Sequence, residues 1–239
     1  MISASLSSPT VKAVIFDCDG TLVDSETSGM TALYEEACKL GYDRPLEQAL
    51  HDFRGQQMAS CIARIESQIG RASPEGFEAT VRKAMAEKFR LGITSMPGAA
   101  ALLQHLTQAG IPYGIASNGP QEKMALTLCL SGLAPYFSNY IFSAYEVGHW
   151  KPSPHLFLHT AREMGMAPQD CAVVEDSLPG LVAGLAAGMQ TYSMCEPSTI
   201  PADIASRVIQ ISGLPDLHRA FLLQPAQTEV KARNLISYQ

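Results

Sequence analysis

The sequence lacks the cysteine patterns that mark disulfide or zinc scaffolds. It has no C-x-x-C pair and no histidine at zinc-finger spacing from a cysteine. Most of the cysteines lie in apolar stretches, where a free thiol behaves as a small hydrophobic side chain. We therefore expect reduced structural thiols and no metal or disulfide staple. The six positions are Cys18, Cys38, Cys61, Cys129, Cys171 and Cys195.

Long apolar runs are also missing. No stretch approaches the roughly 20 uninterrupted apolar residues that a membrane-spanning helix needs. The first nine residues have neither the basic nor the apolar region of a secretory signal. We therefore expect a cytoplasmic protein that does not enter a membrane.

Positive charge is in deficit. The chain has 17 basic and 23 acidic residues, a net charge of -6. Duplex nucleic acid and anionic membranes need a broadly positive surface, so both are disfavoured as partners. A small anionic substrate remains possible if positive groups are concentrated locally, and a monomer is the default expectation.

Length and composition indicate a globular protein with an insertion. The 239 residues divide into about 1.6 domains of average size, which fits one large domain or one domain that carries an insertion. Hydrophobic residues make up 46% of the chain. A chain of this length buries about 70% of its unfolded surface, enough for a core without covalent staples.

Apolar runs alternate with helical patterns through most of the chain. Such alternation is typical of βαβ crossovers, and it predicts an α/β fold with a doubly wound, Rossmann-like parallel sheet. The apolar runs are too continuous for two-sided antiparallel strands. We predict strands at 12–17, 112–117, 140–143, 171–175 and 190–194, and helices at 98–109, 121–130, 155–164 and 178–187.

One stretch breaks this alternation. Residues 24–95 contain no convincing strand but three or four amphipathic helix candidates, the clearest at 26–40, 56–69 and 74–91. Pro74 suits the first turn of its helix, with Ser73 as N-cap. We therefore predict a helical domain inserted after the first strand. The predicted division is a core of residues 1–23 and 96–225, an inserted domain of residues 24–95 and a tail of residues 226–239.

Polar side chains follow the predicted strands at their carboxyl ends, where folds of this type bind ligands. Asp17 and Asp19 follow the first strand, and the alternative, an Asp-Gly hairpin turn, is disfavoured because no second strand comes next. Ser117, Asn118 and Gly119 follow the second strand, either as a turn or as a phosphate contact at a helix N-terminus.

Two further signals come later in the chain. Lys151 precedes Pro152 and is either a surface charge or part of the site. Glu175 and Asp176 close another strand, where a cation would relieve their mutual repulsion. The alternative is that Asp176 is the N-cap of the next helix, and this role does not exclude a role in binding a cation.

Taken in order, these four signals resemble the motifs of the haloacid dehalogenase superfamily. The inserted helices resemble the cap of its β-phosphoglucomutase-like phosphatases, and the resemblance extends over residues 11–217. Residues 117–120 and 150–154 look most like the 6-phosphogluconate phosphatase branch. The resemblance implies a Mg²⁺-dependent phosphoric monoester hydrolase that acts on small phosphorylated metabolites, such as sugar or sugar-acid phosphates.

The resemblance also implies roles for individual residues. Asp17 is the nucleophile that forms an aspartyl-phosphate, and Asp19 is the general acid and base. Mg²⁺ is held by Asp17, the Asp19 carbonyl and Asp176, with Glu175 nearby. Ser117 and Lys151 stabilise charge on the phosphoryl oxygens. Asn118 and the backbone at Cys18 complete the phosphate cradle, and the cap residues expected to meet the substrate are Arg54, Gln56 and Gln57.

Differences between this sequence and the motifs of related families reduce the number of reactions that the chain could catalyse. The dehalogenases lack the second aspartate, so Asp19 favours phosphoryl transfer. The sugar-phosphate mutases carry a hinge histidine and a cap arginine where this chain has Gly29 and Met58. A phosphohexomutase is therefore the second hypothesis. A non-catalytic, receiver-like phospho-acceptor module is the third, although receivers have no helical insertion.

Overall fold

A parallel six-stranded sheet forms the centre of the protein in a computed structural model that describes residues 11–54 and 56–222. The strand order is β3-β2-β1-β4-β5-β6, and every neighbouring pair is parallel. This confirms the predicted doubly wound α/β fold. The strands are β1 (Ala13–Phe16), β2 (Tyr113–Ser117), β3 (Ile141–Ser143), β4 (Cys171–Glu175), β5 (Gln190–Ser193) and β6 (Ile209–Gln210).

Helices cover both faces of the sheet, and β1 explains why its sequence is continuously apolar. Val14 and Phe16 pack on one face, in the cluster that includes Leu102 of α5, whereas Ile15 packs on the other with Leu156 of α8. Alternate side chains of a strand point to opposite faces, so a strand buried on both sides needs apolar residues throughout. The core helices are α5 (Ala99–Gln108), α6 (Gln121–Leu130), α7 (Ala144–Val147), α8 (His155–Glu163), α9 (Leu178–Ala186), α10 (Ala202–Ala205) and α11 (Leu214–Leu222).

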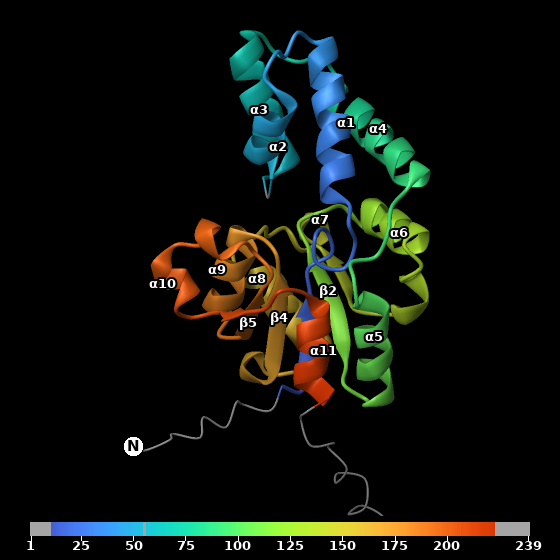
Figure 1. The fold of residues 1–239 in the computed structure, drawn as a ribbon, viewed down its shortest axis with the longest axis vertical. Helices are drawn as coiled ribbons and strands as arrows, with labels where there is room; N and C mark the ends of the chain where they lie inside the picture. The colour runs from blue at the N-terminus through green and yellow to red at the C-terminus, as the bar shows by residue number, and fades with distance from the viewer. Residues whose placement is uncertain (1–10, 55, 223–239) are drawn as a thin grey trace, which may run out of the picture.

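Four further helices lie between β1 and α5 in the chain and form a separate layer, the cap, at the top of Figure 1. They have a hydrophobic cluster of their own, which includes Leu33, Phe53, Ile65 and Val81. The proposed domain limits at residues 23 and 96 stay a prediction, and residues 1–10 and the predicted tail at 226–239 lie outside the described residues. The cap helices are α1 (Glu26–Lys39), α2 (Leu46–Phe53), α3 (Met58–Ile69) and α4 (Phe77–Leu91).

The start of α4 differs from the prediction. Gly76 is its N-cap and Phe77 its first residue, so Pro74 is not in the first turn. The Ser73 hydroxyl and amide both donate to Oε1 of Glu66, at 2.6 and 2.8 Å. Ser73 was therefore wrongly predicted as the N-cap, because its side chain is used to tie the loop back to α3.

Two adjacent segments join the cap to the core. The Asp24 amide donates to the Thr94 carbonyl at 3.0 Å, and the Met96 amide donates to the Leu22 carbonyl at 2.8 Å. Val23 makes an isolated antiparallel bridge with Ser95. The cap is therefore attached through two short segments that are hydrogen-bonded to each other, directly after the polar residues that follow β1.

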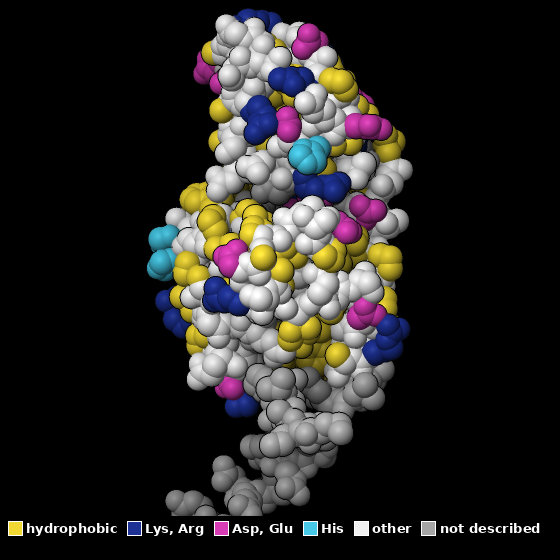
Figure 2. All heavy atoms as spheres, turned by 60° about the vertical axis from the view of Figure 1, so that its left-hand side comes forward, with side chains coloured by type: hydrophobic (Ala, Val, Ile, Leu, Met, Phe, Trp, Pro, Cys, Tyr) yellow, Lys and Arg dark blue, Asp and Glu magenta, His cyan; other side chains and the backbone are white. Residues whose placement is uncertain are grey.

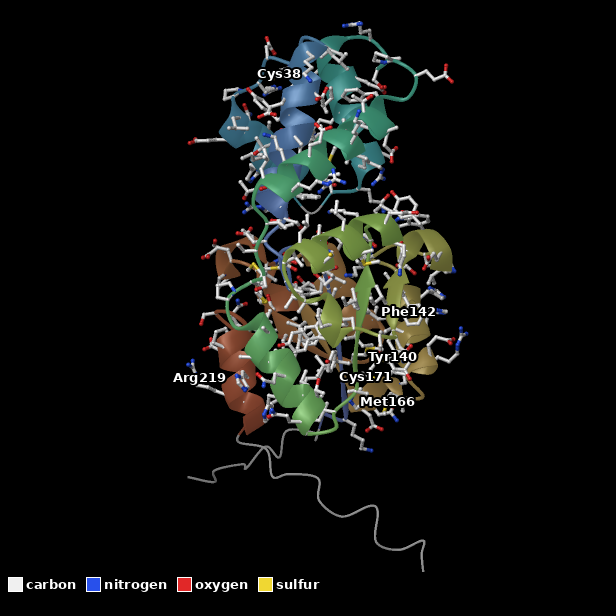
Figure 3. The ribbon with its side chains drawn as sticks, turned by 90° about the vertical axis from the view of Figure 1, so that its right-hand side faces the viewer. Cys38, Tyr140, Phe142, Met166, Cys171 and Arg219 are labelled. Carbon is white, nitrogen blue, oxygen red and sulfur yellow. The ribbon has the colours of Figure 1, made fainter. Side chains whose placement is uncertain are left out.

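Surface charge, cysteine pairing and helix hydropathy can each be compared with what the sequence composition predicts. In the face shown in Figure 2, basic side chains are interspersed with acidic ones rather than gathered into one field. All six cysteines are unpaired, and Figure 3 shows Cys38 in the cap, far from Cys171 in the core. Among the described residues, no helix has the length and apolar character needed to span a membrane.

Candidate active site

A cavity of about 190 Å³ lies where the cap meets the carboxyl edge of the sheet. Its lining combines polar residues that follow β1, β2 and β4 with mostly apolar residues of the cap. Eight of the residues predicted for the site line it. They are Asp17, Asp19, Gln56, Gln57, Ser117, Asn118, Lys151 and Asp176.

Asp17 is the first residue after β1 and is largely buried, with 8% of its surface exposed. Its Oδ1 accepts a hydrogen bond from Lys151 Nζ at 2.5 Å. Burial raises the pKa of Asp17 to about 7, and the nearby Lys151 ammonium limits that rise. A carboxylate with this pKa is available in ionised form near neutral pH, as a nucleophile must be.

Lys151 is almost completely buried and connects two strand ends. Its ammonium donates to Asp17 and to Oε1 of Glu175, and it lies 4.9 Å from the centre of the Phe157 ring. Burial opposes the charge, but the two carboxylates outweigh it and raise the pKa of Lys151. The side chain is therefore a permanent positive charge beside Asp17.

Glu175 is fully buried, and both of its oxygens have partners. Oε1 takes Lys151, while Oε2 accepts from the Asp176 amide at 3.1 Å and from the Ser177 amide and hydroxyl at 3.0 and 2.8 Å. Glu175 does not line the cavity. Although we predicted it near the metal, its contacts favour a role in positioning Lys151, because no oxygen is left to face the cavity.

Asp176 lies against the backbone of the loop after β1. Its Oδ1 accepts from the Thr21 hydroxyl at 3.0 Å, and a Cβ built on Gly20 would come within 2.0 Å of its Oδ2. Burial, followed by the charges of Asp17 and Glu175, raises the pKa of Asp176 well above its usual value. The helix N-cap is Ser177, whose side chain accepts from the Gly180 amide, so the capping alternative for Asp176 is wrong.

This environment fits a small divalent cation. Asp17 and Asp176 are buried carboxylates with raised pKa values, and Lys151 is the lysine that partly offsets their charge. A cation bound beside them would favour their ionised forms. Within the described ranges, no three side chains of His, Cys, Asp or Glu form a metal-binding group. Asp17, Asp176 and a main-chain carbonyl at Asp19 suit Mg²⁺, which prefers oxygen ligands and retains several waters.

Asp19 is held at both carboxylate oxygens. Oδ1 accepts from the Ser25 hydroxyl, next to the start of α1, and Oδ2 pairs with Lys123 Nζ at 2.8 Å. Burial would raise the pKa of Asp19, but the Lys123 charge and these hydrogen bonds lower it. Sequence reasoning missed Lys123, which lies in the polar first turn of the helix at 121–130, where a lysine gives no signal of function.

The loop after β2 is folded back on itself. The Gly119 amide donates to Ser117 Oγ at 3.0 Å, and the Ser143 hydroxyl donates to the Gly119 carbonyl at 2.7 Å. Asn118 uses its side-chain amide on the backbone of Lys151 rather than leaving it free for phosphate. The Cys18 side chain is fully buried in the core and outside the cavity lining, so only its backbone is available to a phosphate cradle.

Two of the three predicted cap residues line the cavity, together with cap residues that were not predicted. Gln56 and Gln57 line the cavity, but Arg54 lies outside the lining and pairs with Glu26 at 3.3 Å. Arg82 was missed because it lies within a helix and belongs to no motif. Tyr145 and Trp150, from the core, also line the cavity and were not predicted.

The two positions that distinguish mutases are also in the cavity lining. A Cβ on Gly29 would lie 2.8 Å from the end of the Met85 side chain, so the larger side chain of a histidine has no room there without rearrangement. Met58 offers no charge for a second phosphate. Neither position therefore supplies the groups that the mutase hypothesis needs.

A buried Asp–Lys pair lies at the carboxyl edge of the parallel sheet, beneath the inserted helices, and this arrangement suits a hydrolase with a Rossmann-like core and a helical cap. The family model described as haloacid dehalogenase-like hydrolase matches residues 11–188. The chain therefore belongs to the haloacid dehalogenase-like hydrolase family. Its predicted family and its predicted nature as a hydrolase are both confirmed.

Known proteins similar to this chain include two from Escherichia coli K12. The 6-phosphogluconate phosphatase is 32% identical over 215 residues, which cover 88% of this chain and 96% of the relative. Hexitol phosphatase A is 34% identical over 200 residues, which cover 80% of this chain and 86% of the relative. These names agree with the predicted phosphoric monoester hydrolysis.

A solved structure shares the fold. A hydrolase of the family from Deinococcus radiodurans R1, crystallised with bound phosphate and sodium, has a TM-score of 0.72 and 29% identity. The alignment covers 89% of this chain and 96% of that one. The whole capped core, rather than one lobe, is therefore common to the two proteins.

Proposed function

We propose that this protein is a Mg²⁺-dependent phosphatase of small phosphorylated metabolites, with sugar or sugar-acid phosphates as substrates and an aspartyl-phosphate intermediate. The observation that carries the proposal is the buried contact of Asp17 with Lys151, beside Asp19, in one cavity between the cap and the sheet edge. The phosphatase names of two relatives support the reaction class.

Asp17 acts as the nucleophile in the first step. A carboxylate oxygen of Asp17 bonds to phosphorus while the bond from phosphorus to the substrate oxygen breaks. Asp19, which must take up a proton against its lowered pKa when substrate binds, gives that proton to the leaving oxygen. In the second step Asp19 takes a proton from a water that attacks phosphorus, and the bond to Asp17 breaks to release phosphate.

Lys151 and Ser117 stabilise the transferring phosphoryl group. Charge spreads over the non-bridging oxygens in the transition state, and fixed donors aimed at them are effective in a site from which water is excluded. Glu175 and Asn118 act through Lys151, since one holds its ammonium and the other its backbone.

Asp17, Asp176 and the Asp19 carbonyl would hold Mg²⁺, and the bound ion would offset the repulsion between these carboxylates and a phosphate dianion. The pairing of Lys151 with Glu175 leaves the charges of Asp17 and Asp176 only partly compensated, which is why these residues fit a cation.

The proposal is tested with p-nitrophenyl phosphate and a panel of sugar phosphates, each assayed with Mg²⁺ and with excess EDTA. Wild-type protein should release phosphate only with the metal, and Asp17→Asn should lose at least about 10³-fold in kcat because the nucleophile is gone. An absence of hydrolysis by the wild type, or an Asp17→Asn variant as active as the wild type, would overturn the assignment.

A further inference from the structure

Three cationic side chains line the cavity, and two of them lie at the catalytic end. Lys151 is committed to Asp17 and Glu175, and Lys123 to Asp19. The third is Arg82, on α4 of the cap. Among the described residues, Arg82 is the one cationic cap residue in the lining. The cap residues are expected to contact the part of the substrate remote from phosphorus.

The guanidinium of Arg82 has donors to spare. Its Nε and Nη2 donate to a single oxygen of Glu78, at 3.0 and 2.5 Å, and Nη2 also donates to the Tyr145 hydroxyl at 2.9 Å. Nη1 makes no hydrogen bond within the part of the chain that the structure describes. Since guanidinium has five N–H donors, the two on Nη1 are available to a ligand.

Tyr145 and Trp150 continue the wall from Arg82 toward the catalytic lysine. The Arg82 guanidinium lies 5.7 Å from the centre of the Tyr145 ring, and Tyr145 meets Trp150 edge to face with 5.4 Å between ring centres. Trp150 directly precedes Lys151. Because the Tyr145 oxygen accepts from Arg82, its own proton can be donated to a substrate.

The surroundings of Arg82 favour a charged ligand group over a neutral one. The guanidinium is charged and partly exposed, so a hydrogen bond from it to an ionised ligand group is charge-assisted and stronger than one to a neutral group. Glu26, the acidic cap residue in the lining, is already paired with Arg54. The apolar part of the cap wall is formed by Met30, Leu33, Phe53, Met58, Cys61 and Met85.

We propose that Arg82, assisted by the Tyr145 hydroxyl, binds a carboxylate at the end of the substrate remote from its phosphate, so that phosphorylated sugar acids are preferred to phosphorylated hexitols. The inference rests on the proposed phosphatase function and adds a specificity residue to it. It also separates the substrate types named in the two relatives, since a gluconate and a hexitol of the same configuration differ at this terminal carbon.

The test compares 6-phosphogluconate with sorbitol 6-phosphate, which share chain length and hydroxyl configuration and differ only in a carboxylate or a hydroxymethyl group at carbon 1. Wild type, Arg82→Gln, Arg82→Lys and Lys83→Gln are assayed for kcat and KM on both. Lys83 is the matched control, because it is an exposed lysine on the same helix outside the cavity lining.

Wild type should hydrolyse 6-phosphogluconate with the higher kcat/KM. Arg82→Gln should lower that value by about 10- to 100-fold, mainly through KM, and change the value for sorbitol 6-phosphate by less than about 3-fold. Arg82→Lys should recover part of the preference, and Lys83→Gln should behave as wild type.

An equal loss on both substrates in Arg82→Gln would overturn the inference, because it would mean that Arg82 only holds cap and core together. Equal use of both substrates by the wild type, or use of neither, would also overturn it. Hydrolysis of p-nitrophenyl phosphate is followed in parallel. If that reaction is absent too, the proposed phosphatase function has failed, and if it is present, only the substrate inference has failed.

Discussion

The side chain of Asn118 holds the backbone of Lys151 from both sides: its Oδ1 accepts from the Lys151 amide at 2.9 Å, and its Nδ2 donates to the Lys151 carbonyl at 3.4 Å. This contact joins the loop after β2 to the loop that carries Lys151. We therefore expect Asn118 to act on the proposed reaction through the position of Lys151.

Replacing Asn118 with Ala should lower kcat by roughly 10- to 100-fold, the usual effect of losing a partner that orients a functional side chain. Asn118→Asp should retain more activity, because it keeps the acceptor for the Lys151 amide. The measurement is steady-state hydrolysis of p-nitrophenyl phosphate. Asn139→Ala is the control, since Asn139 is exposed and outside the cavity lining. Unchanged kcat in Asn118→Ala would show that the contact is dispensable.

Gly180 should tolerate no side chain. A Cβ there would lie 1.9 Å from Cδ of Glu175, so Gly180→Ala must displace either α9 or the carboxylate that holds Lys151. We expect a loss of about 1–3 kcal/mol in the free energy of unfolding, together with lower activity.

Urea denaturation and phosphatase assays measure the two effects of Gly180→Ala. Gly92→Ala is the matched control, because nothing lies within 4 Å of its Cβ position and its φ of 165° is open to any residue. A Gly180→Ala protein as stable and as active as this control would contradict the packing described here.

Stabilisation by Mg²⁺ should depend on pH in a defined direction. Burial raises the pKa of Asp17 to about 7, so protons compete with the metal below that pH. Ionising Asp17 in the metal-free protein removes stability as pH rises from about 4 through about 7, and the bound cation offsets this loss.

The increase in Tm on adding Mg²⁺ should therefore be larger at pH 8 than at pH 6. It should be much smaller in Asp176→Asn, which loses a proposed ligand, and unchanged in Asp203→Asn, an exposed site on α10. Equal shifts at the two pH values, or a full shift in Asp176→Asn, would count against Asp17 and Asp176 as the metal ligands.

The sequence was informative where the local pattern and the fold agree. The five strands with apolar runs were predicted, whereas β6 was missed because its two residues are exposed and have no such run. The short helix α2 was not among the candidates that stood out by pattern. The residues at the strand ends could be grouped in advance because parallel strands end at one edge of the sheet.

What the sequence could not show is how side chains use their donors and acceptors. Glu175 and Asn118 belong to recognisable motifs, yet their contacts with Lys151 depend on loops that meet only in three dimensions. Lys123 and Arg82 lie within helices and reach the cavity through the relative placement of helix, sheet and cap. No local pattern encodes that placement.

The central claim is that Asp17 becomes phosphorylated, and chemical trapping tests it most directly. In Asp19→Asn, p-nitrophenolate can still leave without a proton, but the base for the attacking water is missing, so the intermediate should accumulate. Quenching this variant with borohydride during turnover should reduce the acyl phosphate and convert residue 17 to homoserine, detected by peptide mass spectrometry. The account predicts conversion at Asp17 that requires both substrate and Mg²⁺. A burst of p-nitrophenolate with residue 17 unmodified, or with the modification at another residue, would contradict it.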